Sequence, residues 1–426
     1  MTVSKKSTFS WVVLTSLALL VAPVLGSGLH GKSSSNINSN ADDKLIAATS
    51  SVPANSSGFA MKLFTQVTND SIKTDSKTNV VVSPFSAFAA LSMTLNGAAG
   101  STREQMAKVL GTTPDGVDAL NRKNQATFAS LAKNDDKIKL EIANAVYADS
   151  ATPFHHQFMD LCRKVYGAEI QNLDFDKPST LTAINSWCND KTHGKIPKIL
   201  ESLKPREKMV LLNAVYFKGK WETPFKDQST LDDQFTLTAG DKVPIKMMHQ
   251  NGSFSYLKAS DFQALSIPYA GKRQSMYLFL PDKNVDLPTF CAEFTNDNWK
   301  QWIPSFHNAK VILSLPRFTV RFSTDLSSAL EQMGMAVAFA PGGANFSKMI
   351  SQAAWIGRVL QKTYMDVNEE GTEAAAVTAV VMETARAVAH PPPIQFRVDH
   401  PFVLALVDND TGEILFIGLI QDPTKS

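Results

Sequence analysis

The chain has 426 residues, 44% of them hydrophobic, with ordinary numbers of glycine and proline. A chain of this length and composition can bury a sizeable hydrophobic core, either in two or three average domains or in one large domain. Its 42 basic and 40 acidic residues are mixed along the sequence and leave a formal net charge of +2, which gives no support for a nucleic-acid partner or an anionic membrane.

Residues 1–26 have the three-part pattern of a secretory signal peptide. Lys5 and Lys6 precede an apolar stretch at residues 11–25, and small residues follow it. The apolar stretch is too short for a membrane anchor, although an uncleaved anchor is the alternative interpretation. We therefore expect the mature protein to be secreted and extracellular, or periplasmic in a Gram-negative bacterium, without membrane attachment after cleavage.

Residues 27–57 are rich in Ser, Asn, Ala and Asp, which predicts a flexible polar linker. We find no internal repeat, and no composition change divides residues 58–426. The sequence therefore predicts one large domain after the linker.

Cysteine usage argues against a fold held by disulfides. Cys162, Cys188 and Cys291 are widely spaced and odd in number, so at least one thiol is free or paired between chains. The chain has no CxxC or HExxH motif, and the adjacent pair His155 and His156 points apart. We expect no metal site and no cofactor.

In the first half, apolar periodicity predicts a helix at 59–67, a strand at 79–83 and a helix through 85–99. A second helix begins near Ser101, where Glu104 would complete a capping box. Residues 112–139 are polar and helical, and their mixed charges favour a solvated surface. A strand at 140–147, a helix at 154–166 and a helix with a turn at 184–203 follow.

In the second half, the unbroken apolar run at 209–225 predicts a central strand covered on both faces. Residues 311–322 form another long strand, and a helix ends near Gly334. Runs at 401–408 and 413–420 form a hairpin around the turn NDTG. Shorter strand-like runs, punctuated by Gly and Pro, lie at 234–237, 243–250, 254–257, 263–270 and 275–281.

The stretch at 365–393 has an unusual composition, because Ala favours helix and the β-branched residues favour strand. As a strand, alternation gives one face without charge or proline, which could enter a sheet. Glu373 and Glu383 lie on the other face. The alternative is an Ala-rich surface helix of an ordinary enzyme. The uncharged face consists of Thr372, Ala374, Ala376, Thr378, Val380 and Met382.

Two strings in this region resemble one known family. NEEGTEAAAVTAVVM, residues 368–382, resembles the reactive-loop hinge of the serpins, and FRVDHPF, residues 396–402, resembles the segment that follows that loop. The resemblance extends over nearly all of the chain after Ser57. It implies an α+β serpin fold with three β-sheets, eight to nine helices and an exposed C-terminal reactive loop able to insert into the main sheet.

The resemblance also implies the activity, a suicide-substrate inhibitor of serine proteases that acts as a monomer and is not an enzyme. In the family, a protease cuts the loop and forms an acyl-enzyme, and loop insertion then traps it. No GxSxG, phosphate-binding or dinucleotide motif supports a catalytic alternative. The second reading is a non-inhibitory serpin-fold protein, acting as a carrier, a chaperone or a bait substrate.

The resemblance assigns roles to particular residues. Gly371 would give the loop backbone freedom where it bends. We expect an ion pair between Arg317 and Glu369 that holds the top of the sheet closed. The hinge comprises Glu369, Glu370, Gly371, Thr372, Glu373, Ala374, Ala375 and Ala376, and the sheet-opening region comprises Trp221, Arg317, Ser83, Ser86, Asn213 and Gln361.

One position departs from the family pattern. Gln361 stands where many serpins have a histidine under the sheet, partnered by the asparagine that corresponds to Asn213. Glutamine can still donate a hydrogen bond to Asn213, and it does not titrate near neutral pH. We expect this contact to form without pH sensitivity.

The cut site determines the target. Counting seventeen residues from Glu369, the usual length in the family, makes Ala385 the last residue before the cut and Arg386 the first after it. A cut after Ala385 favours elastase-like or subtilisin-like proteases. If the loop is one residue longer, Arg386 precedes the cut and trypsin-like proteases become the target.

Overall fold

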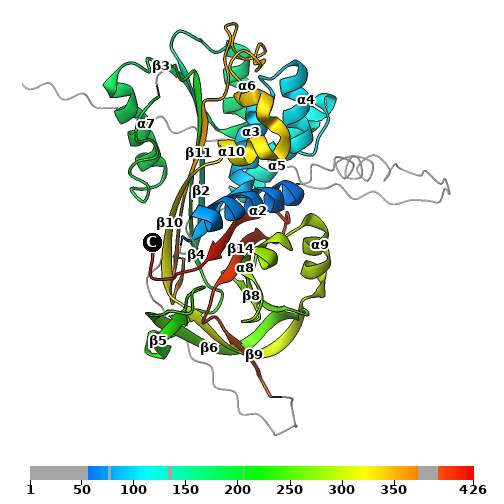
Figure 1. Cartoon of the computed structure of the whole chain (residues 1–426), viewed down its shortest axis with the longest axis vertical. Coiled ribbons are helices and arrows are strands. Elements are labelled where there is room, and N and C mark those ends of the chain that lie inside the picture. The colour runs from blue at the N-terminus through cyan, green and yellow to red at the C-terminus, as the bar shows by residue number, and fades with distance from the viewer. Residues whose placement is uncertain (1–55, 75–77, 133–136, 205, 373–391) are drawn as a thin grey trace, which may run out of the picture. The chain divides into compact units, whose positions relative to one another are not determined.

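The computed structural model describes residues 56–74, 78–132, 137–204, 206–372 and 392–426, which all belong to one compact unit. Helix α2 begins at Ser56, so the predicted polar linker, which ends at Ser57, overlaps its first turn. Within the described ranges lie nine α-helices, labelled as in Figure 1: α2 (Ser56–Thr74), α3 (Pro84–Leu95), α4 (Gly100–Val109), α5 (Val117–Leu131), α6 (His156–Tyr166), α7 (Pro178–Lys191), α8 (Leu287–Ala292), α9 (Asn296–Ser305) and α10 (Ser327–Leu330).

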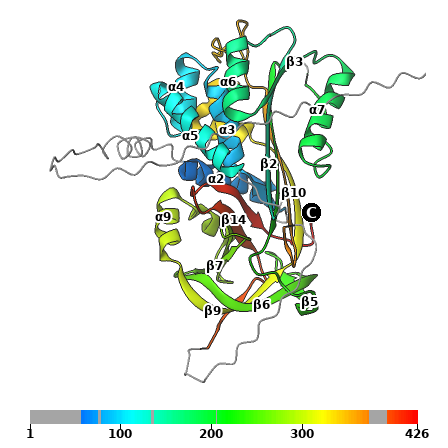
Figure 2. The same ribbon diagram turned by 180° about the vertical axis from the view of Figure 1, so that it is seen from behind.

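A six-stranded sheet separates α7 from the other helices of its half of the molecule (Figures 1 and 2). Its central strand is formed by residues 209–220 and pairs in parallel with one neighbour and antiparallel with the other. The central strand predicted from the apolar run is therefore confirmed. The strand order is β10 (Phe318–Asp325), β11 (Arg358–Val367), β4 (Met209–Lys220), β2 (Ile138–Asp149) and β3 (Glu169–Leu173), and β12 (Gly371–Thr372) also pairs with β4.

The second sheet has nine strands and contains the expected second and third sheets of the fold. Strand β6 joins them, because one part of its length pairs with β5 and another with β7. The runs at 243–250 and 254–257 are therefore one strand. The strands are β1 (Val80–Val82), β15 (Ile414–Ile420), β14 (Phe402–Asp408), β8 (Gln274–Pro281), β7 (Phe262–Pro268), β6 (Lys242–Lys258), β9 (His307–Pro316), β13 (Ile394–Arg397) and β5 (Thr230–Thr236).

The single long strand predicted at 311–322 is wrong. The chain instead forms β9 and β10, which belong to different sheets. Pro316 ends β9 and lacks the N–H group that a continuing ladder would use. The next residue, Arg317, still donates its backbone N–H to the Lys246 carbonyl at 2.9 Å, after which the chain pairs with β11.

The predicted capping box at Ser101 and Glu104 is also wrong. Helix α4 follows Ala99, and no side chain caps its first turn. The loop at Asn345 binds the start of α4 instead. The Ala99 N–H donates to the Asn345 carbonyl at 2.9 Å, and the Asn345 N–H donates to Thr102 Oγ1 at 2.9 Å. A tertiary contact thus replaces the local one.

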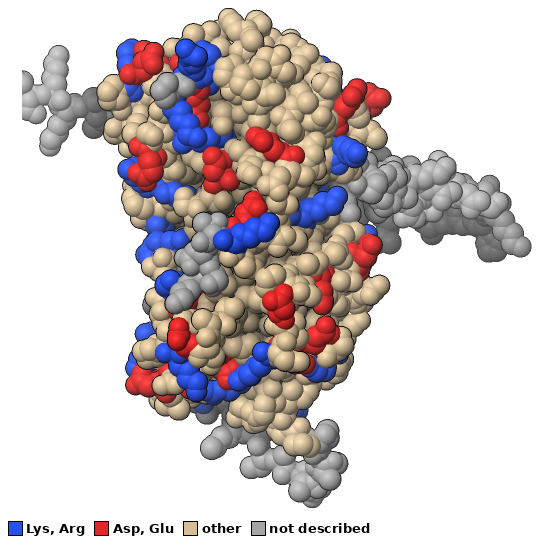
Figure 3. Space-filling view, in the orientation of Figure 1, with Lys and Arg blue, Asp and Glu red and all other residues tan. Residues whose placement is uncertain are grey.

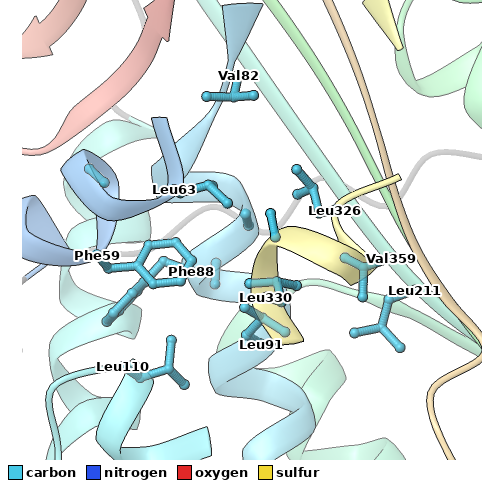
Figure 4. Packing of buried hydrophobic residues seen from close by; sticks show 14 of the residues in the cluster. Phe59, Leu63, Val82, Phe88, Leu91, Leu110, Leu211, Leu326, Leu330 and Val359 are labelled. Atoms are coloured by element: carbon cyan, nitrogen blue, oxygen red, sulfur yellow. The ribbon is translucent and has the colours of Figure 1, made fainter. Parts of the chain in front are cut away.

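The main hydrophobic core lies between the helices and the inner face of the six-stranded sheet. All twelve residues of α3 are buried, as expected for a helix enclosed on every side. Figure 4 shows Phe59 of α2 against Phe88 of α3, and the ring centroids are 5.5 Å apart. Leu211 and Val359, from β4 and β11, belong to the same core.

Helix α7 covers the outer face of the same sheet, and it includes the first part of the helix and turn predicted at residues 184–203. Ile184 and Cys188 pack against Leu212 and Ala214 of β4 and Tyr147 of β2. The sheet is thus enclosed on both faces near its middle. This agrees with the unbroken apolar pattern of β4.

A buried ion pair fastens the start of β11 to the segment that precedes β4. Arg358 Nε lies 2.6 Å from Glu207 Oε1, and Arg358 Nη2 lies 2.7 Å from Glu207 Oε2. Arg358 Nη2 also donates to the Ser202 carbonyl at 2.8 Å. Both side chains are at most 10% exposed, so each charge depends on its partner.

We therefore expect Arg358→Met to lower the free energy of unfolding by about 3 to 5 kcal/mol, because it leaves the Glu207 carboxylate buried without its counter-charge. The midpoint of urea unfolding at pH 7 measures the loss. The double variant Arg358→Met/Glu207→Leu should recover most of it. A single variant as stable as the wild type would contradict this account of the pair.

Candidate functional site

The chain reverses direction immediately after β11, in a turn that we call the hinge turn, residues 368–371. The Asn368 N–H donates to the Gly371 carbonyl at 2.9 Å, and the Gly371 N–H donates back to the Asn368 carbonyl at 3.2 Å. After the turn, Gly371 and Thr372 pair antiparallel with Lys220 and Gly219 of β4. The start of the loop therefore already lies along the central strand.

Three hydrogen bonds from the segment after β4 hold the hinge turn in place. Trp221 donates its backbone N–H to the Glu370 carbonyl at 2.9 Å and its indole Nε1–H to the Asn368 carbonyl at 2.9 Å. The Phe225 N–H donates to the Glu369 carbonyl at 2.7 Å. Trp221 is 2% exposed and stacks on Tyr269 with ring centroids 4.4 Å apart. The predicted Trp221 thus lies at the hinge and binds it directly.

The expected ion pair at the top of the sheet is present. Arg317 Nη1 lies 3.7 Å from Glu369 Oε1, and the same oxygen accepts a hydrogen bond from Thr230 Oγ1 at 2.8 Å. Glu369 is nearly buried, with a side chain 10% exposed, whereas Arg317 is 50% exposed. The Glu369 carboxylate thus joins the hinge turn to Thr230 of β5 and to Arg317, which directly precedes β10.

Gly371 occupies a position where a side chain has no room. Its φ of 147° lies in the region that disfavours L-residues, as the sequence interpretation of this glycine anticipated. A Cβ atom there would overlap the Gly219 carbonyl oxygen and lie 2.6 Å from Lys220 Cα. Close contact between the hinge and β4 therefore requires glycine.

Glu370 lies between opposing charges. Burial raises the pKa of its carboxyl group, the nearby Lys220 and Lys218 lower it, and Asp227 and Glu369 raise it further. One of its carboxylate oxygens, Oε2, is buried and accepts no hydrogen bond from any described residue. The net effect is a raised pKa for Glu370, with burial as the main cause and the lysines of β4 offsetting part of the rise.

Below the hinge, three amide side chains form a row across the sheet, at matching positions of β2, β4 and β11. Gln361 Nε2 donates to Asn213 Oδ1 at 2.5 Å, and Asn213 Nδ2 donates to Asn144 Oδ1 at 2.5 Å and to Ser86 Oγ. The contact predicted between Gln361 and Asn213 is confirmed. We call Ser83, Ser86, Asn144, Asn213 and Gln361 the amide cluster.

The amide cluster also ties the sheet to the start of α3. Gln361 accepts from the Ser83 N–H at 2.8 Å and donates to the Ser83 carbonyl at 2.9 Å. Ser83 Oγ donates to the Leu415 carbonyl at 2.6 Å. The cluster therefore fixes β4 and β11 against each other and against the helix below them.

Sequence reasoning missed Asn144, although a signal was available. The string NAVY occurs at residues 144–147 and again at 213–216, and each copy places an asparagine inside an apolar strand. The antiparallel register aligns the two asparagines directly. A polar residue in such a strand usually has a buried partner, and here each is the other's partner.

Other predicted site residues lie outside the described residues. These are Glu373, Ala374, Ala375 and Ala376 of the hinge and the two residues of the expected cut, Ala385 and Arg386. For Thr372, the structure describes only the backbone, which pairs with Gly219 of β4.

The three thiols are buried and free, which agrees with the predicted absence of a disulfide framework. Burial raises the pKa of Cys188 and of Cys291 to about 12, and it raises that of Cys162 as well. Among the described residues, no group of three or more His, Cys, Asp or Glu side chains could hold a metal ion. None of the described helices has the length and apolar character needed to cross a bilayer.

We expect Gly371→Ala to release the hinge turn from β4, because the new methyl group overlaps backbone atoms that cannot move aside. The amides of Trp221 and Phe225, which donate to the hinge, should then exchange hydrogen at least roughly tenfold faster. Hydrogen exchange measured by mass spectrometry checks this. Gly342→Ala is the control, since Gly342 also has a positive φ but faces open space; equal exchange in both variants would contradict the role given to Gly371.

We expect Gln361→Leu to lower the free energy of unfolding by at least about 2 kcal/mol, because it leaves the Ser83 N–H and the Asn213 oxygen without partners. Chemical denaturation measures the change. The exposed Gln352 gives a matched control, and Gln352→Leu should change stability by less than about 0.5 kcal/mol. Similar losses in the two variants would argue against the amide cluster as a structural fastening.

Comparison with known proteins places this architecture in one family. A family model described as "Serpin (serine protease inhibitor)" matches residues 54–423. Serpin B6 of Macaca fascicularis is 35% identical over 374 residues, which cover 86% of this chain and 97% of the relative. The leukocyte elastase inhibitor of Equus caballus is 33% identical over 378 residues, with the same two coverages.

A solved structure gives the same result. The crystal structure of a thermophilic serpin, Tengpin, in its native state is similar to this chain with a TM-score of 0.79 and 32% identity, and the match covers 92% of this chain and 96% of that one. The predicted fold class is thereby confirmed, and the family is one of protease inhibitors rather than enzymes. The chain belongs to the serpin family.

Proposed function

We propose that this chain is a secreted inhibitor that traps a serine protease covalently after the protease cuts the reactive loop. The protease serine attacks the scissile carbonyl, an ester to the loop forms, and the amine end of the downstream peptide leaves. The inhibitor then changes conformation before water hydrolyses the ester. The observation that supports this most directly is the hinge, which is already paired with β4.

The strand directions in the six-stranded sheet favour insertion of the loop next to β4. Strand β4 pairs antiparallel with β2. It pairs in parallel with β11 over seven residue pairs. A strand that continues from the hinge would run antiparallel to both β4 and β11. One parallel contact would then be replaced by two antiparallel ones, which add a strand's hydrogen bonds and are somewhat more stable per residue.

The same register indicates which contacts would oppose insertion. Gly371 is opposite Lys220 and Thr372 is opposite Gly219, so residue 375 would come opposite Tyr216. Tyr216 is already paired with Tyr364 of β11. Insertion beyond the first positions therefore requires β11 to separate from β4, which breaks the hydrogen bond between Gln361 and Asn213.

Loop cleavage supplies the missing freedom. In the intact chain, the loop is bound at both ends, by β12 on β4 and by β13 on β9. After cleavage, only the hinge end stays covalently attached to the segment that inserts, and the protease travels with it as an ester. A trap of this kind is kinetic, since it depends on insertion being faster than hydrolysis.

The target class rests on the cut site, which lies in the segment that contains Ala385 and Arg386. A cut after Ala385 suits an elastase-like or subtilisin-like protease, and the similarity to a protein named leukocyte elastase inhibitor supports this choice. A cut after Arg386 suits a trypsin-like protease. We favour the cut after Ala385.

Secretion is proposed from the sequence of residues 1–26, with residues 27–57 as a linker and residues 58–426 as one domain that acts as a monomer. Residues 1–55 lie outside the described residues. The support for export is the basic, apolar and small-residue pattern of a signal peptide.

Incubation of the purified protein with an elastase-like and a trypsin-like protease tests the proposed function. We expect a complex that survives a denaturing gel and a released peptide whose mass corresponds to a start at Arg386, or at Ala387 if the loop is longer. The uncomplexed, cleaved inhibitor should melt at a much higher temperature than the intact protein, because insertion adds a strand to the sheet.

A protease whose active serine has been blocked is the control, and it should give neither complex nor peptide. Cleavage without a complex and without a gain in melting temperature would refute trapping, and would favour the non-inhibitory reading.

A further inference from the structure

Four residues form one row across the outer face of the six-stranded sheet, beside the end of α7. Arg321 of β10 is opposite Tyr364 of β11, and Tyr364 is opposite Tyr216 of β4. Tyr216 is in turn opposite Glu141 of β2. Both tyrosines are buried and belong to the hydrophobic cluster under α7. The row therefore crosses the boundary between β4 and β11, where the proposed function requires the sheet to open.

The segment that follows α7 lies over this row, and we call it the α7 strap, residues 192–200. His193 and Gly194 have left-handed backbone conformations, with φ of 51° and 79°, which end the helix and turn the chain. Asn185 of α7 binds the far end of the strap. Its Oδ1 accepts from the Leu200 N–H at 2.9 Å, and its Nδ2 donates to the Leu200 carbonyl at 2.9 Å. The strap is thus fastened to α7 at both of its ends.

The α7 strap contacts the row on both sides of the boundary between β4 and β11. On the β4 side, His193 Nε2 lies 3.5 Å from Glu141 Oε1, and the His193 ring meets the Tyr216 ring edge to face with centroids 6.2 Å apart. On the β11 side, Lys195 Nζ lies 5.4 Å from the centroid of the Tyr364 ring. Two strap residues only two positions apart thus contact strands that separate during insertion.

Tyr364 has a second cation beside its ring, because Arg321 Cζ lies 5.0 Å from the ring centroid. A cation within about 6 Å of a ring centroid is attracted by the negative face of the aromatic ring, and more strongly where water is excluded. Tyr364 is 5% exposed. Figure 3 shows Lys and Arg side chains, with Asp and Glu among them, along the side of the molecule that carries α7 and β10 in Figure 1. The Tyr364 ring thus links the α7 strap to β11 and β10.

We propose that Lys195, Arg321 and Tyr364 form a clasp that holds β11 and β10 to the α7 strap, and so opposes the separation of β11 from β4 on the outer face of the sheet. The inference rests on the proposed trapping function and names positioning residues for it. The contact between Gln361 and Asn213 lies on the inner face of the same two strands, three residues farther from the hinge turn along β11. The two sets of contacts therefore resist opening from opposite faces.

Opening of the sheet breaks the clasp by one of two routes. If β11 and β10 move away from β4, the Tyr364 ring leaves Lys195, because the strap stays with α7 on β2 and β4. If the strap follows β11 instead, His193 leaves Tyr216 and α7 loses its packing on β4. Contacts that are lost before the transition state of opening raise its barrier. The clasp therefore acts on the rate at which the sheet opens.

Hydrogen exchange of the intact protein, followed peptide by peptide with mass spectrometry, tests the clasp. The double variant Lys195→Met/Arg321→Met removes both charges and keeps much of the apolar length of each side chain. We expect the amides of β11 and of α7 to exchange roughly threefold to tenfold faster in this variant. Tyr364→Leu should reproduce the faster exchange. Tyr364→Phe should stay close to the wild type, because phenylalanine keeps the aromatic face that attracts the cations.

Lys164→Met is the matched control, since Lys164 is exposed and lies in the last turn of α6, on the other side of the sheet from α7. It should leave the exchange of β11 and α7 unchanged. The inference is overturned if the double variant behaves as this control, or if α7 alone exchanges faster, which would make Lys195 an anchor of the helix only. Equally faster exchange in the hairpin of β14 and β15 would mean a general loss of stability and would also overturn it. No protease is present, so the result is independent of whether the wild type forms the covalent complex that tests the proposed function.

Discussion

The parallel contact between β4 and β11 is the interaction on which the rest of this structure depends. Three separate devices fasten it along its length. The Arg358–Glu207 pair holds the start of β11, the amide cluster holds the middle, and the Arg317–Glu369 pair lies just beyond its far end. All three oppose the same movement, the separation of two strands that are already neighbours in hydrogen-bonding register. These polar contacts are specific to one arrangement of the two strands, and they add to the hydrophobic packing on both faces of the sheet.

Much of the fold follows from local patterns in the sequence. The unbroken apolar run of β4 predicted a central strand, and the hairpin of β14 and β15 followed from two apolar runs around NDTG. The errors have separate causes. At Ala99 the local pattern predicted a cap that a distant loop supplies instead. At Pro316 the apolar pattern continued past a proline that ends β9, where the chain passes to another sheet. Local propensity is a weak guide where the chain passes from one sheet to another or where a distant loop supplies the cap.

Most residues of the candidate site could be predicted from the sequence, whereas its geometry could be predicted only in part. The resemblance to the serpins identified Trp221, Arg317, Asn213 and Gln361, and the structure brings each of them to a partner. Register cannot be read from composition, because it depends on which strands pair and at which offset. The alignment of Asn144 with Asn213, and the overlap that excludes a side chain at Gly371, therefore appeared only with the structure.

The position of Cys188 has a practical consequence for following this protein in solution. Its thiol is buried between α7 and the outer face of the sheet, and burial raises its pKa to about 12, so almost none of the reactive thiolate is present at neutral pH. Any rearrangement that lifts α7 from β2 and β4 would return this thiol to solvent and restore its ordinary reactivity. The native chain thus contains a chemical reporter whose alkylation rate measures how often the covered face of the sheet becomes accessible, without the introduction of a label.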